Sequence, residues 1–114
     1  MKRGEIWLIN LDPTVGAEIS KKRPALIVNE NGMGKLPLRI IAPITAWRPH
    51  YRLADWMVKV DAGEPSNLDK DSSVDTFQIR SIDEKRMISR IGCLTEAQLD
   101  TVERSMKTVL AIDV

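Results

Sequence analysis

Cysteine and histidine are almost absent from this sequence, which has one of each, Cys93 and His50. A single cysteine excludes a disulfide within the chain and fits a reducing compartment. One cysteine and one histidine are also too few for a zinc site built from the usual ligands. The sequence has no glycine-rich phosphate-binding loop and no serine in a nucleophile-elbow motif. Metal, nucleotide-binding and serine-hydrolase chemistry therefore find no support in these residues.

Long apolar runs are also missing. The first residues lack the apolar stretch of a secretory signal peptide, and no window approaches the roughly 18–20 apolar residues of a membrane span. We therefore expect a cytoplasmic protein without membrane contact. The 114 residues are 43% hydrophobic, which is enough for one modest core, and no linker or internal repeat divides them. We expect a single domain over residues 1–114.

The net charge is small, at +1, but the charges are unevenly distributed along the chain. Residues 21–52 hold seven lysines and arginines against one acidic residue, whereas residues 53–85 hold four against eight. If this polarity is kept in the folded protein, one surface is basic enough to bind a polyanion. If the charges interleave on the folded surface, the pattern carries no such meaning, because clustering in sequence is not clustering in space.

Short apolar segments, separated by proline, glycine and polar turns, predict a mainly-β fold. The final segment differs, since Thr95 and Gln98 have the spacing of a capping box. Helical spacing then predicts an amphipathic helix over residues 96–111, with an apolar side made of Leu99, Val102, Met106, Val109 and Leu110. These elements favour an α+β, mainly-β fold, a compact antiparallel barrel with the helix lying on the sheet. Strands are expected at residues 5–9, 24–28, 38–43, 57–60, 72–77, 79–82 and 88–94, with a helical turn or loop at 64–68 and a helical turn at 83–86.

The stretch over residues 4–28, GEIWLINLDPTVGAEISKKRPALIV, carries the most specific chemistry in the sequence. It reads as a strand, a polar loop and a second strand that begins after three consecutive cations. Pro24 pushes the residue before it, Arg23, into an extended conformation. A guanidinium held in this way at the mouth of a strand pair can bind a phosphate through two parallel hydrogen bonds. From the residues alone, a loop arginine in a salt bridge is the simpler interpretation.

The pattern GEIWLxxLDPTxGxE, followed by RPxLIV, resembles the opening of the MazF/PemK/Kid toxins, small ribonucleases of bacterial type II toxin–antitoxin systems. Residues 43–45 (PIT), residues 78–83 (QIRSID) and the closing helix stand at the places expected for that family, so the resemblance covers nearly the whole chain. It implies a small SH3-like antiparallel barrel of the CcdB/PemK/MazF type with a C-terminal helix. It also implies a sequence-selective endoribonuclease that cuts single-stranded RNA, in particular messenger RNA.

The resemblance implies that Arg23 is catalytic, as a phosphate ligand and electrostatic stabiliser, and that Thr45 is the family's catalytic threonine or serine. Without the resemblance, Thr45 reads as a threonine that merely ends a strand. Glu18 is a third catalytic candidate, because a carboxylate near Arg23 could orient the guanidinium or act as general base. A solvated loop acid is an equally good interpretation of Glu18. Neither a metal nor a cofactor is expected, and the candidate RNA-binding residues are Lys21, Lys22, Trp47, Arg48, Gln78 and Arg80.

These side chains suit RNA cleavage without a metal ion, since the ribose 2′-hydroxyl supplies the nucleophile and the protein aligns it, stabilises charge and moves protons. The products would carry a 2′,3′-cyclic phosphate and a free 5′-hydroxyl. The resemblance further implies a homodimer and a MazE-like antitoxin, whose acidic, apolar tail lies over the basic groove. Two alternatives stay open: a CcdB-like gyrase poison, and a non-catalytic barrel that binds RNA or an antitoxin.

The sequence departs from the family pattern at several positions. Ala17 stands where Kid-like members often carry histidine, and Ile19 and Lys21 replace a glutamine and a glycine of the common pattern. Asp75 and Phe77 occupy the positions of an arginine and an aspartate that Kid uses, so those two roles do not transfer. The general base and the cleavage sequence therefore stay open.

Overall fold

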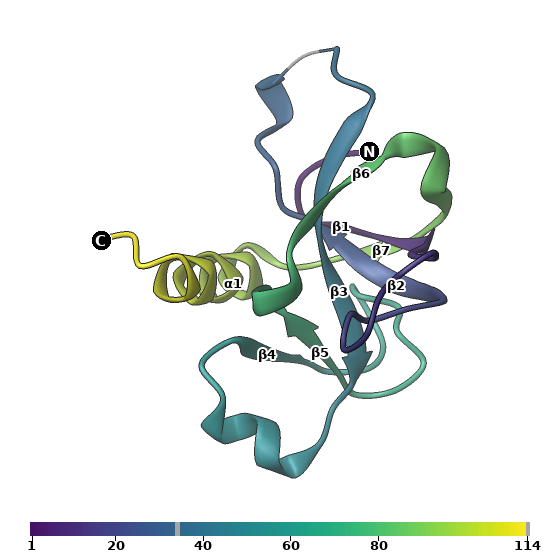
Figure 1. The fold of residues 1–114 in the computed structure, drawn as a ribbon. Coiled ribbons are helices and arrows are strands. Elements are labelled where there is room, and N and C mark those ends of the chain that lie inside the picture. Colours follow the sequence, from purple (N-terminus) through teal and green to yellow (C-terminus); the bar gives the residue numbers. More distant parts are fainter. Residues whose placement is uncertain (34, 114) are drawn as a thin grey trace.

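The computed structural model describes residues 1–33 and 35–113 of the chain. Within these ranges the chain forms strands that cross in the body of the molecule, and one α-helix lies to the side (Figure 1). The strands are β1 (Glu5–Asn10), β2 (Lys22–Ile27), β3 (Leu38–Ala46), β4 (Met57–Val60), β5 (Ser72–Asp75), β6 (Arg80–Asp83) and β7 (Met87–Cys93). The helical elements are the short 3₁₀ helices η1 (Asn31–Met33), η2 (Pro49–Leu53), η3 (Thr76–Gln78) and η4 (Glu84–Arg86), and the helix α1 (Glu96–Val109).

Strand β3 organises the sheet because it pairs with three other strands. β2 pairs with it at residues 41–43, and β6 and β5 pair with it at residues 38–41 and 44–46. The strand order is β4-β5-β3-β2-β1-β7, with β6 also on β3, and the pairs are antiparallel. This confirms the mainly-β class with one C-terminal helix. No pairing within the described ranges joins β4 to β7, so the sheet is not closed into a complete barrel.

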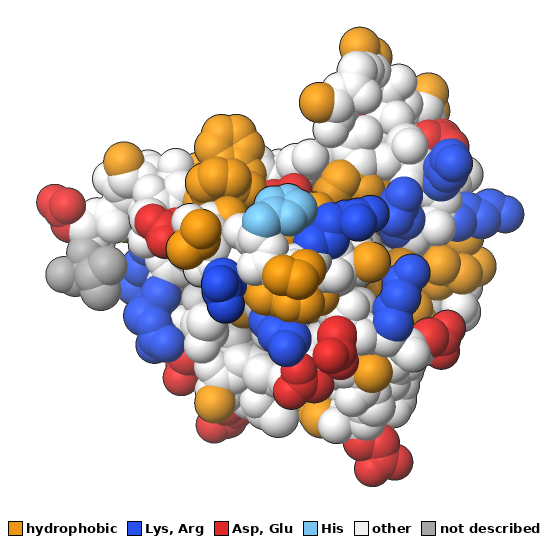
Figure 2. Space-filling model, turned by 90° about the horizontal axis from the view of Figure 1, so that it is seen from below, with side chains coloured by type: hydrophobic (Ala, Val, Ile, Leu, Met, Phe, Trp, Pro, Cys, Tyr) orange, Lys and Arg blue, Asp and Glu red, His pale blue; other side chains and the backbone are white. Residues whose placement is uncertain are grey.

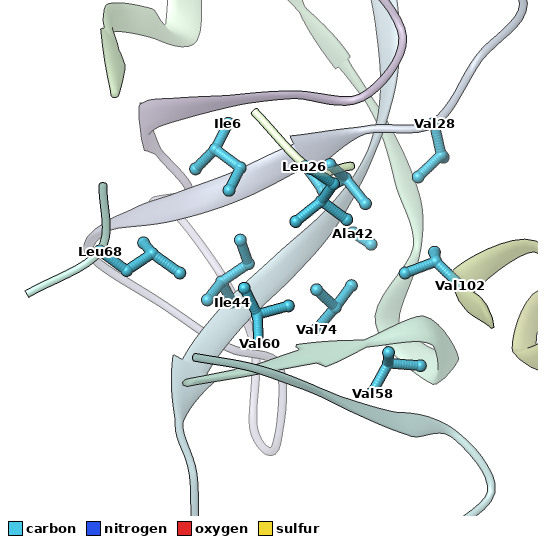
Figure 3. Packing of buried hydrophobic residues seen from close by; sticks show 11 residues of the cluster. Ile6, Leu26, Val28, Ala42, Ile44, Val58, Val60, Leu68, Val74 and Val102 are labelled. Carbon is cyan, nitrogen blue, oxygen red and sulfur yellow. The ribbon is translucent and has the colours of Figure 1, made fainter. Parts of the chain in front are cut away.

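Alternation along the central strands divides the buried side chains between two faces of the sheet. On the face towards α1, Leu26 and Ala42 pack with Val102 of the helix, as Figure 3 shows. On the other face, which we call the second face, Ala25 and Ile41 belong to a separate cluster. That cluster consists of Ile9, Leu11, Ala25, Ile27, Ile41 and Ile82, with Trp7, Ile19 and Met87 packed against it.

Helix α1 begins with the predicted capping box. The Gln98 amide donates to the Thr95 hydroxyl at 3.1 Å, and the Thr95 amide donates to the Gln98 side-chain oxygen at 2.8 Å. Val102 is fully buried, as the helical spacing predicts. The placement of Leu110 on the buried side was wrong, because the helix ends at Val109 and Leu110 is 52% exposed. None of the described helices is long and apolar enough to cross a membrane.

Two strand predictions need correction. The strand predicted at 72–77 ends at Asp75, because the Asp75 side chain accepts hydrogen bonds from two following amides and caps η3. The strand predicted at 38–43 continues to Ala46, since β5 pairs with its last three residues. Residues 64–67 form a turn, which agrees with the helical turn or loop predicted at 64–68. The other predicted elements agree with the structure within two residues at each end.

Glu5, at the start of β1, makes the free energy of unfolding depend on pH in the acid range. Burial alone raises the pKa of its carboxyl, but hydrogen bonds from the Lys2 amide and the Trp7 indole, with the nearby amino-terminal charge, lower that pKa from 4.5 to about 2. The stabilisation is therefore complete above pH 4.5 and is lost as the pH falls towards 2. We expect Glu5→Gln to lower the free energy of unfolding at neutral pH by roughly 1–2 kcal/mol. The variant should also lose less of this free energy than the wild type as the pH falls from 4.5 towards 2. Urea denaturation across this pH range measures both effects, and the exposed Glu64→Gln should change neither.

Candidate functional site

Arg23 and Thr45 lie on the same face of neighbouring strands. β2 and β3 pair with Ala25 opposite Pro43. The paired residues of β2 and β3 end there, and Arg23 and Thr45 each lie two residues beyond this pair along their own strands. The alternation of side chains puts both on the second face. The predicted arginine and the predicted hydroxyl therefore share one surface.

The guanidinium of Arg23 is held from one side. Its Nε donates to the Ser20 carbonyl at 2.9 Å, and the side chain is only partly buried. Within the described ranges, no carboxylate oxygen lies at ion-pair distance from it, and its Nη nitrogens form no hydrogen bond. The salt-bridge interpretation of Arg23 is therefore wrong. Among the described residues, the Nη groups of Arg23 are therefore free to form two parallel hydrogen bonds to an anion, the geometry by which arginine binds phosphate.

A groove of about 410 Å³ opens next to this surface. We call it the loop groove; it is lined by residues 17–19 of the β1–β2 loop, by Pro43 and by residues 77–80. Pro43 points to the second face, two residues from Thr45. Its lack of an amide hydrogen fits the sheet here, because β3 is paired with neither β6 nor β5 at residues 42–43. The groove therefore lies where the sheet is interrupted.

Gln78 and Arg80 hold the β1–β2 loop beside the groove. The Gln78 side-chain oxygen accepts from the Ile19 amide at 2.6 Å, and its nitrogen donates to the Ala17 carbonyl at 3.3 Å. Arg80 donates to the Leu11 carbonyl at 3.2 Å. Both predicted RNA-binding side chains thus contact the protein backbone. A base or phosphate must compete with these hydrogen bonds or use the atoms that they leave free.

The other loop residues take different positions. Glu18 is exposed and lines the loop groove, but its carboxylate accepts from the Val15 amide at 2.7 Å and does not pair with Arg23. Lys21 is exposed, with a positive φ of 72°. Lys22 is exposed too, and strand alternation turns it away from the face of Arg23. Of the two cations in β2, only Arg23 faces the predicted site.

Trp47 and Arg48 lie apart from the loop groove. Trp47 lines a second groove of about 550 Å³ that is formed with residues of β4 and α1, and the Lys59 ammonium lies 5.4 Å from its ring centroid. Arg48 is exposed just before η2. Within one chain, Trp47 and Arg48 do not line the loop groove.

Next to the loop groove lies a cluster whose grouping the sequence did not indicate, although Phe77 by itself is a candidate to stack an unpaired base. The rings of Trp56 and Phe77 pack edge to face, and both line a small pocket with Asp75. Burial raises the pKa of the Asp75 carboxyl, and hydrogen bonds from the Phe77 and Gln78 amides oppose the shift only in part. No local pattern pairs Trp56 with Phe77, because their segments meet only through the tertiary fold.

The surface charge is uneven in the folded protein as well. On the face drawn in Figure 2, Lys and Arg side chains form a broken band interspersed with hydrophobic side chains, and acidic side chains lie mainly below it. Such a band attracts a polyanion. In the part of the chain that the structure describes, no group of three or more histidine, cysteine or acidic residues is placed to hold a metal ion.

The two hydrogen bonds of Gln78 predict that its side chain anchors the β1–β2 loop. We expect Gln78→Ala to free the Ile19 amide, and hydrogen exchange at that amide should accelerate by roughly 5-fold or more, equivalent to about 1 kcal/mol. Gln78→Glu keeps the acceptor for Ile19 but loses the donor to Ala17, so its effect should be smaller at Ile19. Unchanged exchange in the alanine variant would contradict the anchoring role.

The described residues thus form a small β protein in which an arginine without an acidic partner and a hydroxyl lie on one face, beside a groove lined by a loop. A family model described as PemK-like, MazF-like toxin of type II toxin-antitoxin system matches residues 2–110. The chain belongs to this family, which confirms the resemblance seen in the sequence.

Individual relatives agree with this assignment. Endoribonuclease EndoA of Bacillus subtilis (strain 168) is 33% identical over 113 residues, which cover 98% of this chain and 96% of that protein. The crystal structure of MazF (Form-I) from Deinococcus radiodurans has a TM-score of 0.79 at 23% identity, covering 97% of this chain and 96% of that one. The MazE-MazF (Form-II) structure from the same organism has a TM-score of 0.73 at 21% identity, with coverage of 99% and 97%. These two structures share the fold of this chain.

Proposed function

We propose that this chain is the toxin of a type II toxin–antitoxin pair, an endoribonuclease that cuts single-stranded RNA with sequence selectivity. Its family and the name of its EndoA relative support this activity. Within the described residues, the proposal rests on one observation: Arg23, which has no acidic partner there, shares the second face with Thr45. A flexible single strand suits this surface, because it can adopt the geometry of in-line attack and expose its bases.

The proposed chemistry needs no protein nucleophile and no metal, because the RNA supplies its own attacking group. The ribose 2′-oxygen bonds to the adjacent phosphorus while the bond to the 5′-oxygen of the next nucleotide breaks. The free Nη groups of Arg23 bind the non-bridging oxygens and stabilise the charge that develops on them. Thr45 donates a hydrogen bond to a phosphate oxygen, and Glu18, the carboxylate that lines the loop groove, is the candidate acceptor of the 2′-hydroxyl proton. The departing 5′-oxygen takes up a proton from water, so the products carry a 2′,3′-cyclic phosphate and a 5′-hydroxyl.

In this proposal residues 1–114 form a single toxin domain, and two copies of the chain form a homodimer. The proposed regulator is a MazE-like antitoxin. The shared fold with a solved MazE–MazF complex supports this partner. An acidic antitoxin tail would compete with RNA for the charge of Arg23. Lys21, Lys22, Trp47 and Arg48 extend the proposed RNA contacts beyond the loop groove.

Incubation of the pure protein with a long single-stranded RNA in excess EDTA tests the activity and its metal independence together. We expect cleavage with 2′,3′-cyclic phosphate and 5′-hydroxyl ends, and much slower cleavage with Arg23→Ala. RNA that stays intact both with and without EDTA would remove the nuclease proposal and leave the gyrase-poison and non-catalytic alternatives. Cleavage that stops only when EDTA is added would remove the metal-free mechanism alone.

A further inference from the structure

Two exposed aromatic rings stand together at the end of the loop groove. Aromatic residues make up only 4% of the sequence, yet Trp56 is 43% exposed and Phe77 is 67% exposed. The ring centroids are 6.3 Å apart and the ring planes meet at 70°, so the pair forms a corner that we call the aromatic corner. Two exposed aromatic rings side by side offer flat surfaces on which a planar ligand can stack.

The backbone that carries the aromatic corner is held by buried hydrogen bonds. The Thr76 amide donates to the Trp56 carbonyl at 2.8 Å. The Thr76 and Ser105 hydroxyls are hydrogen-bonded at 2.7 Å, and the Ser105 hydroxyl donates to the Asp55 carbonyl at 2.6 Å. Both hydroxyl residues are buried, so helix α1, η3 and the segment before β4 are tied together beneath the rings. Rings on a fixed backbone lose little conformational entropy when a ligand binds.

A carboxylate lies at the same place. A pocket of about 230 Å³ is lined by Trp56, Asp75, Phe77 and Gln78. Asp75 Oδ1 accepts from the Phe77 amide at 3.0 Å and from the Gln78 amide at 3.3 Å. Oδ2 has no hydrogen bond within the described ranges, and no buried side-chain oxygen there lacks a partner, so Oδ2 keeps contact with solvent. This oxygen is available to accept a hydrogen bond from a ligand.

The pocket adjoins the loop groove, because Phe77 and Gln78 line both. We propose that the aromatic corner binds one unpaired nucleobase near the scissile phosphate, and that Asp75 selects a base whose edge offers an N–H donor. Base stacking on an aromatic ring and a carboxylate that accepts from a base amino group are both established modes of recognition. This subsite deepens the proposed RNA cleavage and rests on it.

A peptide is the other ligand class that exposed aromatic rings attract. The acidic tail expected of an antitoxin fits this pocket less well, because the Asp75 carboxylate lies in it and repels like charge. A nucleobase is uncharged, planar and rich in N–H donors, and it belongs to the strand that the adjoining groove is proposed to hold. These observations favour RNA as the occupant.

Cleavage of a randomised single-stranded RNA pool, followed by sequencing of the new 5′ ends, tests the subsite. We expect Trp56→Ala and Phe77→Ala to lower kcat/KM by roughly 5- to 100-fold and to erase the base preference at one position of the cleavage site. Phe77→Tyr and Trp56→Phe keep a ring and should retain that preference. Asp75→Asn keeps the η3 cap through its amide oxygen but replaces Oδ2 by a donor, so the preferred base at that position should change.

Leu53→Ala is the matched control, because Leu53 is 84% exposed and lines neither groove nor the aromatic corner. If the wild type cleaves and Phe77→Ala keeps both its rate and its base preference, the subsite is overturned and the proposed function stands. If the wild type does not cleave, the proposed function fails, and fluorescence anisotropy with labelled RNA then tests the subsite. Weaker RNA binding by both alanine variants than by the wild type supports the subsite. Equal binding by all three proteins, or no binding by the wild type, overturns it. Loss of antitoxin affinity with unchanged RNA cleavage would make the corner a peptide site and would also overturn it.

Discussion

Replacing Arg23 with alanine is expected to lower kcat/KM for RNA cleavage by about 10²–10³-fold, or roughly 3–4 kcal/mol of transition-state stabilisation. The reason is the isolation of this cation: it is held by one carbonyl and has no acidic partner within the described ranges. Arg23→Lys keeps a positive charge but loses the planar fork, so its rate should lie between those of the wild type and the alanine variant. Thermal unfolding of both variants checks that the fold is kept, and a rate within threefold of the wild type in Arg23→Ala would refute the role.

The placement of Arg23 and Thr45 on one face can be tested by a double-variant cycle. Thr45→Val removes the hydroxyl at nearly constant volume, and Thr45→Ser restores it as the control. If both side chains act on one phosphate, the Arg23→Ala, Thr45→Val double variant should lose less activity than the product of the single losses. Strictly multiplicative losses would mean that the two groups act on different parts of the substrate.

Replacing Gly92 with alanine is expected to lower the free energy of unfolding by roughly 3 kcal/mol. A Cβ at this position of β7 would lie 2.2 Å from the Ser66 carbonyl oxygen and 2.6 Å from that of Pro65. These are backbone atoms, and the Pro65 carbonyl also accepts from the Cys93 amide at 3.0 Å, so the turn cannot move away without losing this hydrogen bond. Urea denaturation measures the loss.

Gly16→Ala is the comparison that separates steric overlap from backbone strain. Gly16 has a φ of 57°, in the left-handed region, but an added Cβ would meet nothing within 4 Å. The expected cost is therefore only about 1 kcal/mol. Equal losses in the two variants would show that the close approach at Gly92 does not exist in solution.

Much of the fold could be predicted from local patterns. The capping box at Thr95 and Gln98 depends on residues three positions apart, and strand alternation depends on neighbours two positions apart. The strand predicted at 72–77 was too long. It ends at Asp75, because the Asp75 carboxylate caps η3. The prediction that Leu110 lies on the apolar side of the helix was also wrong. The helical spacing of apolar residues continues to Leu110, but the helix ends at Val109.

The sequence by itself determined the mainly-β class, the extended Arg23 before Pro24 and the family, because these depend on residue types at short, fixed spacings. Only the tertiary structure decided which candidate residues meet. The pairing of Ala25 with Pro43 places Arg23 and Thr45 on one face, whereas Trp47 lines another groove and Trp56 packs against Phe77. The physical reason is that contacts between distant segments depend on strand register and on which face each side chain takes, and a shift of one residue would reverse every face.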